Sequence, residues 1–383
     1  MNYELSQEAV KYLENAKQET IDLIEALCKI PAPSHHEEKR AEFIKNWLEN
    51  EGAKGVYIDE AKNCVFPMNC EGRNDITVFN AHTDTVFPDS EPMPFVNDGT
   101  YLHSPGVGDD TGNLAKMMMV IKYILNNNLM PEKPVLFVAN SCEEGLGNLK
   151  GIKQIMKEYE GRIEKVYALD LGYTWVCNKC VGSHRYEIMF ETEGGHSFGA
   201  FGNRNAIHAM SQFITKLYQC EVPQIEDSQT TYNVGIVEGG TSVNTIAQKA
   251  KMMYEYRSDS KECIEIMKNF FEEKIKEAQK DEKVKITVNV LGIRPCSGEV
   301  DETVVDEMTK KAFSACEKYS GKAPEITKGS TDCNIPMSMG IPAVCFGTHI
   351  SDGTHTREEK LLIESIPAGL KVAAHMILSE CGL

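Results

Sequence analysis

Short, almost wholly apolar runs alternate with helix-length segments along most of the chain, and this alternation limits the fold more than any other feature. The runs at 76–81, 135–141, 166–171 and 343–347 have the length of strands and lack the polar alternation of a half-exposed strand. Strands that are buried on both faces between helices indicate a mainly parallel sheet sandwiched by helices. The sequence therefore predicts an α/β fold.

The pattern changes near residue 183, where alternating strands replace apolar ones. The order of strands and helices that follows is β-α-β-β-α-β, which is typical of a ferredoxin-like α+β motif. We expect an inserted domain at 183–295, and a main domain made of 1–182 and 296–383. In the main domain we expect helices at 4–29, 37–50, 113–128, 301–319 and 359–379. In the inserted domain we expect helices at 203–219 and 260–280, and strands at 185–194, 232–240, 249–258 and 283–292.

Five segments deliver side chains of the kind that bind metals, most of them where an apolar run ends. They are AHTDTV (81–86), GVGDDTGN (106–113), SCEEGLG (141–147), ALDLG (168–172) and DGTHTREE (352–359). The carboxyl ends of strands in an open α/β sheet are where ligands bind. Two histidines with several carboxylates suit zinc, manganese or cobalt, with room left for water.

The residues can be sorted by what a two-metal hydrolase requires. His82 and His355 supply imidazoles, and Asp109, Glu144 and Asp170 supply carboxylate ligands. Glu143 remains as the base that carries a proton to the leaving group. Asp84 lies two residues after His82, so on an extended segment it can accept the second imidazole N–H.

Each motif also has a plainer interpretation. The pair Asp109-Asp110 can cap the helix that follows, and Glu143-Glu144 can be an exposed pair. Asp170 and the His82 motif can be turn residues, and the pair Cys177 and Cys180 lacks the second pair that a structural zinc site needs. The joint occurrence of the segments at strand ends favours a metal site over these alternatives, and packing is the expected role of the two cysteines.

Composition limits the partners and the compartment. The formal net charge is −17, which argues against nucleic acid as a partner. No apolar stretch has the length of a membrane span, and the N-terminus lacks the pattern of a signal peptide. Thirteen cysteines without such a signal indicate reduced thiols, so we expect a cytoplasmic protein that does not bind membranes.

The five segments resemble those of metallopeptidase family 20 in clan MH. This is the co-catalytic zinc exopeptidase and deacylase family of glutamate carboxypeptidase, peptidase T, succinyl-diaminopimelate desuccinylase and acetylornithine deacetylase. The resemblance implies two divalent ions, most often Zn²⁺ with Co²⁺ or Mn²⁺ as alternatives, bridged by Asp109. It also implies a cis peptide between Asp109 and Asp110, and it favours His355 over His349 as the last ligand.

The resemblance extends into the inserted domain, as a lid and dimerisation domain. There it implies that His196 reaches the partner subunit's site in a homodimer and stabilises the oxyanion. It implies that Asn244 and Arg257 bind the substrate carboxylate, and that Ser330 and Thr331, with Asp332, belong to a substrate loop. The plainer interpretations are a surface turn for His196 and a strand-end salt bridge for Arg257.

The sequence thus predicts a metal-dependent exopeptidase that hydrolyses a terminal amide bond of a small peptide. An N-acyl amino acid deacylase is the alternative within the same chemistry, although Asp170 resembles the peptidase branch more than the deacetylase branch. A non-catalytic metal-binding protein of the same fold and a mononuclear zinc protein are the alternatives outside it.

Overall fold

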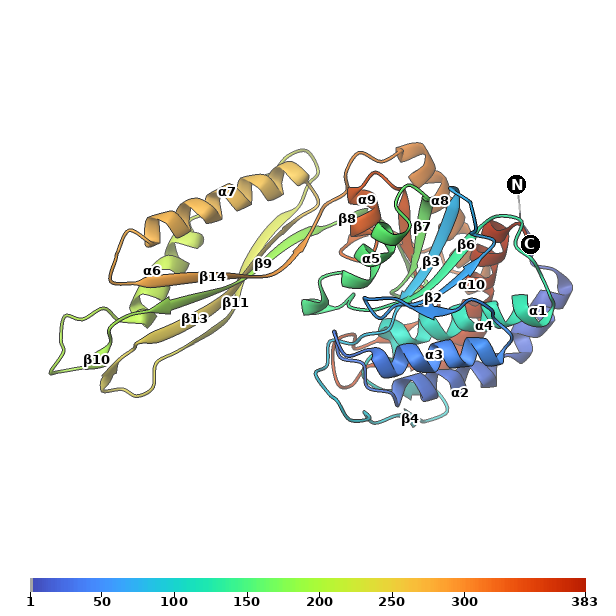
Figure 1. Cartoon of the computed structure of the whole chain (residues 1–383), viewed down its shortest axis with the longest axis horizontal. Coiled ribbons are helices and arrows are strands. Elements are labelled where there is room, and N and C mark those ends of the chain that lie inside the picture. Colours follow the sequence, from blue (N-terminus) through green and yellow to red (C-terminus); the bar gives the residue numbers. More distant parts are fainter. Residues whose placement is uncertain (1–2) are drawn as a thin grey trace. The chain divides into compact units, whose positions relative to one another are not determined.

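Two separate hydrophobic cores divide the chain, and each belongs to one unit of the structure. The computed structural model describes residues 3–383, apart from the side chain at position 146. Unit 1 comprises the chain up to Cys180 together with Gly298–Leu383, and unit 2 comprises Val181–Ser297. Figure 1 shows both units coloured along the chain.

Unit 1 is built on an eight-stranded sheet with the order β1-β2-β6-β3-β7-β16-β8-β15. The central strands β6, β3, β7 and β16 are parallel to one another, and β15 is parallel to β8. The pairs β1–β2, β2–β6 and β16–β8 are antiparallel. In sheet order the strands are Tyr57–Ile58, Cys64–Met68, Val135–Asn140, Ile76–His82, Ile163–Leu169, Ala343–Phe346, Trp175–Cys180 and Glu325–Gly329.

Helices lie on both sides of this sheet (Figure 1), which accounts for its apolar strands. Every residue of β3, β6 and β16 is buried, so no position needs a polar side chain for contact with water. The predicted α/β fold with a mainly parallel sheet is confirmed. The α-helices of unit 1 are α1 Gln7–Asn15, α2 Lys17–Cys28, α3 Glu38–Asn50, α4 Gly112–Asn126, α5 Lys150–Glu158, α8 Glu302–Ser320, α9 Asn334–Ser338 and α10 Ile366–Cys381.

Two predicted helices of unit 1 were wrong in extent. The expected helix 4–29 is two helices that meet at Ala16, which both ends α1 and begins α2. The expected helix 359–379 begins only at Ile366, with a proline in its first turn. The residues before it form β18 (Lys360–Leu362) and a 3₁₀ turn, because they pair with β5 (Tyr101–His103).

Unit 2 has a four-stranded antiparallel sheet with the order β11-β13-β9-β14. Its strands are β9 Gly182–Glu191, β11 Thr230–Gly239, β13 Lys249–Ser258 and β14 Lys285–Arg294. The core of the unit lies between this sheet and the helices α6 (Ala206–Leu217) and α7 (Lys261–Ala278). The expected strands and helices of this segment are confirmed to within a few residues, in the order of a ferredoxin-like motif. The short strands β10 (Gly195–His196) and β12 (Thr245–Ile246) form a separate pair.

None of the helices in the described residues has the length and apolar character needed to cross a bilayer. All thirteen cysteines lie in the described part of the chain, and none of them forms a disulfide.

Candidate metal centre

Three neighbouring strands end at one edge of the unit 1 sheet and bring the candidate ligands there. Strand β3 ends at His82, and β7 ends one residue before Asp170. Strand β6 ends at Asn140, shortly before Glu143 and Glu144. Since β6, β3 and β7 are parallel neighbours, their carboxyl ends meet at this edge. His82, Glu143, Glu144 and Asp170 are all buried.

Asp109 lies at a kink in the segment Val107–Thr111, which leads into α4, and its own backbone is not helical (φ −113°, ψ 89°). The peptide bond between Asp109 and Asp110 is cis, as the resemblance implied. One carboxylate oxygen of Asp109, Oδ1, is 2.9 Å from His82 Nε2. The other, Oδ2, is 3.0 Å from His355 Nε2. Each oxygen of one carboxylate therefore faces a different imidazole.

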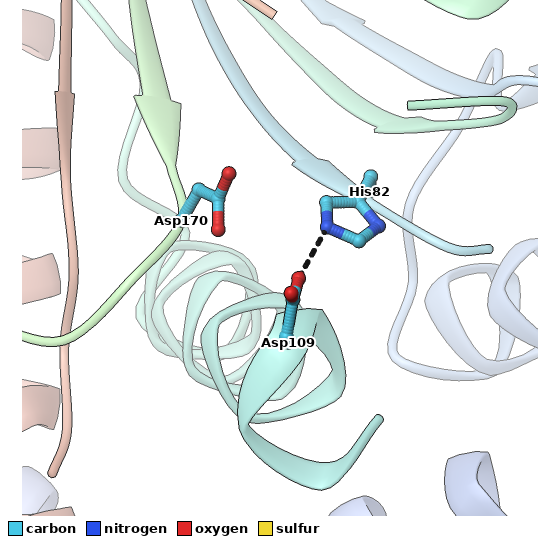
Figure 2. Close-up of side chains that lie close together, drawn as sticks. All are labelled: His82, Asp109 and Asp170. Carbon is cyan, nitrogen blue, oxygen red and sulfur yellow. Dashed lines mark hydrogen bonds and ion pairs between the residues drawn. The ribbon is translucent and has the colours of Figure 1, made fainter. Parts of the chain in front are cut away.

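The candidate ligands form two groups that share Asp109. The first group is His82, Asp109 and Asp170, whose side chains point toward one another in Figure 2. The second is Asp109, Glu144 and His355. Within each group the ligand atoms lie within 4.8 Å of one another. Each group thus offers one imidazole, one carboxylate of its own and one shared carboxylate, which fits a pair of divalent ions of the zinc type.

Burial and the nearby charges shift the pKa values of the candidate ligands. Burial, with the nearby charge of Asp109, raises the pKa of Glu144 to about 8 and that of Asp170 to about 7. Hydrogen bonds to Asp109 and Glu144 raise the pKa of His355 to about 10. Against the effect of burial, hydrogen bonds from His355 and His82 hold the pKa of Asp109 below its usual range. Without a cation, Glu144 and Asp170 hold their protons more tightly than ordinary carboxyl groups do, and a divalent ion would displace those protons.

Asp84 anchors the segment that carries the two glutamates. Its carboxylate accepts the backbone N–H groups of Glu143 and Glu144 at 2.9 and 3.0 Å, and the hydroxyl of Ser34 at 2.6 Å. His82 Nδ1 is 3.1 Å from the main-chain oxygen of Asp84 and 3.5 Å from its carboxylate. The predicted acceptor for this imidazole N–H was the carboxylate, whereas the main-chain carbonyl is nearer.

Glu359 holds the segment that carries Asp109, and no motif in the sequence had selected this residue. Its buried carboxylate accepts the backbone N–H groups of Gly106, Gly108 and Asp109 at 2.7, 2.8 and 2.8 Å. Glu359 follows His355 in the loop between β17 (Ser351–Asp352) and β18. One loop therefore supplies both a candidate ligand and the anchor of the shared one. The only signal in the sequence was the acidic pair that follows His355.

The remaining candidates of unit 1 belong to neither group of metal ligands. His349 is fully buried and belongs to neither ligand group. Thr331 is buried, and its hydroxyl accepts the backbone N–H of Cys333 at 3.2 Å, so it stabilises a turn. Ser330 is half-buried. Cys177 and Cys180 are buried on β8 and contribute to neither ligand group, in agreement with a role in packing.

The candidates of unit 2 lie in two places, two of them at the short β10–β12 pair and one on the four-stranded sheet. His196 pairs with Thr245 across the short strands β10 and β12, and Ser197 N–H donates to the main-chain oxygen of Asn244 at 2.9 Å. His196 and Asn244 are therefore neighbours, and both are exposed. Arg257 lies near the far end of β13, eight residues after Lys249 (257 − 249), which is roughly 26 Å at the usual rise of a strand. There it donates two hydrogen bonds of 3.0 Å to Glu255.

The comparisons with known proteins agree with this geometry. Residues 78–379 match peptidase family M20/M25/M40. The chain is 25% identical to succinyl-diaminopimelate desuccinylase of Corynebacterium glutamicum over 90% of this chain and 92% of that protein. A tripeptidase from Staphylococcus aureus has the same fold, with a TM-score of 0.74, 23% identity and coverage of 96% and 99% of the two chains. A dinuclear metal-binding peptidase from Bacillus subtilis gives a TM-score of 0.63 at 16% identity, over 95% and 99% of the chains. The chain belongs to peptidase family M20/M25/M40 and is a metal-dependent hydrolase of amide bonds.

Proposed function

We propose that this protein is a two-metal exopeptidase that hydrolyses a terminal amide bond of a small peptide. The observation that carries the proposal is the position of Asp109, whose two oxygens face His82 and His355 separately. A carboxylate shared between two imidazoles suits two ions held close together. A mononuclear site does not need a shared carboxylate. The B. subtilis peptidase of the same fold, described as dinuclear, supports the same assignment. Zinc is the proposed metal, with cobalt or manganese as alternatives.

Each residue of the centre has a proposed role. When bound, the ions would polarise the scissile carbonyl and lower the pKa of a water molecule. Glu143 accepts the proton from the attacking water and delivers it to the leaving amine. Asp84 fixes the backbone of Glu143, so that its carboxylate stays beside the ligand groups. His82, Asp109, Glu144, Asp170 and His355 hold the ions.

His196 is the proposed donor to the oxyanion. The backbone N–H groups of Phe198 and Gly199 donate to its Nδ1 at 3.3 and 3.2 Å. With Nδ1 acting as an acceptor, the ring proton resides on Nε2, which is then a donor. A donor aimed at developing negative charge stabilises a tetrahedral transition state.

A homodimer is part of the proposal, because the substrate-binding candidates of one unit 2 cannot all reach one small substrate. His196 and Asn244 lie at one end of the unit, and Arg257 lies roughly 26 Å along β13 from that end. Two copies would allow His196 and Asn244 of one chain to act with Arg257 of the other. Arg257 would then exchange its bonds to Glu255 for bonds to the substrate carboxylate.

An N-acyl amino acid deacylase is the second candidate, and the similarity to a desuccinylase favours it. Both reactions hydrolyse an amide bond, so the same centre can serve either. We place the enzyme in the cytoplasm, with a small peptide or an N-acyl amino acid as its partner and with neither nucleic acid nor membrane.

One experiment separates the candidates. The purified protein, loaded with Zn²⁺, Co²⁺ or Mn²⁺, is incubated with dipeptides, tripeptides, folate-like glutamates and N-acetyl or N-succinyl amino acids. The proposal predicts two ions per chain and turnover of peptides. Preference for the acyl amino acids would select the deacylase, and two ions without any turnover would indicate a non-catalytic protein. A single ion per chain would contradict the two-metal assignment.

A further inference from the structure

Three buried side chains form a bracket at the base of the metal centre. We use "bracket" for Asn80 on β3, Asn140 at the end of β6, and Asp332 in the loop between β15 and α9. Asp332 Oδ2 accepts the side-chain amides of both asparagines at 2.7 Å. Asn80 also donates to Asn140 Oδ1 at 3.0 Å. The exposed fractions are 0%, 0% and 3%, so water does not compete for these bonds.

The bracket joins the two strands that lead to different parts of the centre. His82 follows Asn80 by two residues, and Glu143 follows Asn140 by three. His82 lies opposite Asn140 in the strand register, and Thr83 donates to the main-chain oxygen of Asn140 at 2.7 Å. Any shift between β3 and β6 at this point would therefore move a metal ligand relative to the proposed base.

The loop that carries Asp332 is itself fixed. Thr331 N–H donates to Asn334 Oδ1 at 2.8 Å, and Asn334 N–H donates to the main-chain oxygen of Thr331 at 3.1 Å. Asp332 is thus presented on a closed turn, close enough to Glu143 and Asp170 to feel their charges. Its second oxygen, Oδ1, is buried and has no hydrogen-bond partner among the described residues. The two hydrogen bonds that Oδ2 accepts are therefore the side-chain contacts that hold this buried acid in place.

We propose that Asp332 is a positioning residue, which sets the distance between His82 and Glu143 by clamping the ends of β3 and β6. The role rests on the proposed two-metal function and goes beyond it, because Asp332 belongs to neither ligand group. It acts through the hydrogen bonds that it accepts from the side-chain amides of Asn80 and Asn140.

Two substitutions at the same position test the clamp. Asp332→Ala removes the acceptor, whereas Asp332→Asn keeps an oxygen that can accept both amides and removes the charge. We expect Asp332→Ala to lower kcat by roughly tenfold to a hundredfold, since small misplacements of reacting groups have effects of that size. KM is expected to stay within about threefold in both variants, and kcat of Asp332→Asn to stay within about fivefold of the parent, because the substrate contacts are unchanged.

A second readout does not need activity. Chelator competition on the metal-loaded protein is expected to remove one of the two ions more easily in Asp332→Ala, because His82 is the ligand that the bracket holds. Asn80→Ala breaks the same bonds from the other end, and the double variant is expected to be no worse than either single one. If Asp332→Ala does not fold, Asn80→Ala carries the test.

Four results would contradict the proposed role of Asp332 or the function on which it rests. A kcat within twofold of the parent for Asp332→Ala, or additive effects in the double variant, would overturn the proposal. Equal losses for Asp332→Asn and Asp332→Ala would also overturn it, since they would show that the charge matters and the clamp does not. If the parent protein binds fewer than two ions, that result contradicts the proposed function and not the clamp. The metal content of the parent protein is therefore measured separately.

Discussion

Glu143 and Glu144 are adjacent in the chain but have different neighbours, and the backbone of both is held by Asp84. Glu143 and Glu144 both donate their N–H groups to Asp84, one to each carboxylate oxygen. The side chain of Glu144 then meets His355 at 3.1 Å, and it belongs to a ligand group, whereas Glu143 belongs to neither group. The two neighbours therefore have different surroundings, and mutation can separate their proposed roles.

Glu143→Ala is expected to lower kcat by about 10²–10⁴-fold, the usual contribution of a general base, while two ions remain bound. Metal analysis and steady-state kinetics on the same preparation measure both effects. Glu144→Ala is the matched control and is expected to lose metal. Normal turnover by Glu143→Ala would remove this residue as the base.

The stability of the metal-free protein is expected to fall as pH rises from about 5 to about 8. Folding raises the pKa of Glu144 to about 8 and of Asp170 to about 7, so the folded state binds their protons more tightly than the unfolded chain does. The stability that these protons contribute is present at low pH and is lost as pH rises through the folded values. The raised pKa of His355 acts in the same direction at higher pH.

Thermal unfolding of chelator-treated protein across this pH range measures the effect. Added Zn²⁺ is expected to reverse it, and to stabilise more at pH 8 than at pH 6, because fewer protons remain to be displaced. A midpoint that rises with pH in the metal-free protein would contradict the assignment.

The candidate ligands could be predicted from the sequence because each is a histidine or carboxylate near the end of an apolar or helical segment. Ser34 and Glu359 could not, because their partners are backbone N–H groups and the Asp84 carboxylate, far away in the chain. Backbone N–H groups are the same at nearly every residue, so no sequence pattern predicts which of them will bind a distant side chain. Tertiary structure alone identifies these anchors.

At the scale of elements, one loop links the two ligand groups. The loop between β17 and β18 carries His355, and its last residue, Glu359, bonds the segment of Asp109. The predicted helix at 359–379 failed for the same reason. Glu359 and the strand that follows are held by these bonds and by β5, which outweigh the helical spacing of their apolar residues.

Glu359→Gln is expected to reduce the free energy of unfolding by about 1–3 kcal/mol, since the side-chain NH₂ would replace one carboxylate oxygen and leave at least one backbone N–H group without its acceptor. Denaturant unfolding of the metal-free protein measures this. The neighbouring Glu358 is exposed, and Glu358→Gln is the matched control with no expected change. Equal stability of the two variants would show that Glu359 does not anchor the segment.

The strands that the sequence did not reveal are the edge of the sheet. β15 is mostly exposed, and β8 carries polar residues at its centre. β15 belongs to the sheet because it pairs with β8, and β8 also pairs with β16. Such pairing requires no apolar run that the sequence could show. The central strands, buried on both faces, were predicted correctly.

At the scale of the whole molecule, the proposed homodimer leads to a complementation test. A mixture of His196→Ala and Glu143→Ala chains is expected to recover up to about a quarter of the parent activity, because half of randomly exchanged dimers contain one complete site of two. Each variant alone is the control. A mixture no more active than the sum of its parts, with exchange verified, would contradict a site shared between chains.

Unit 2 begins and ends on paired neighbouring strands. Ser183 lies opposite Arg294 in the register of β9 and β14, so the two ends of the insertion are already joined by the sheet. Because its two ends are adjacent, the segment can be exchanged as one piece. If it is removed, a short hairpin turn can join the two ends that remain in unit 1. If another segment is inserted there, the entropic cost of loop closure for unit 1 is small. Recombination within the family can therefore exchange the whole segment, with its His196 and Arg257, while the metal-binding scaffold stays intact.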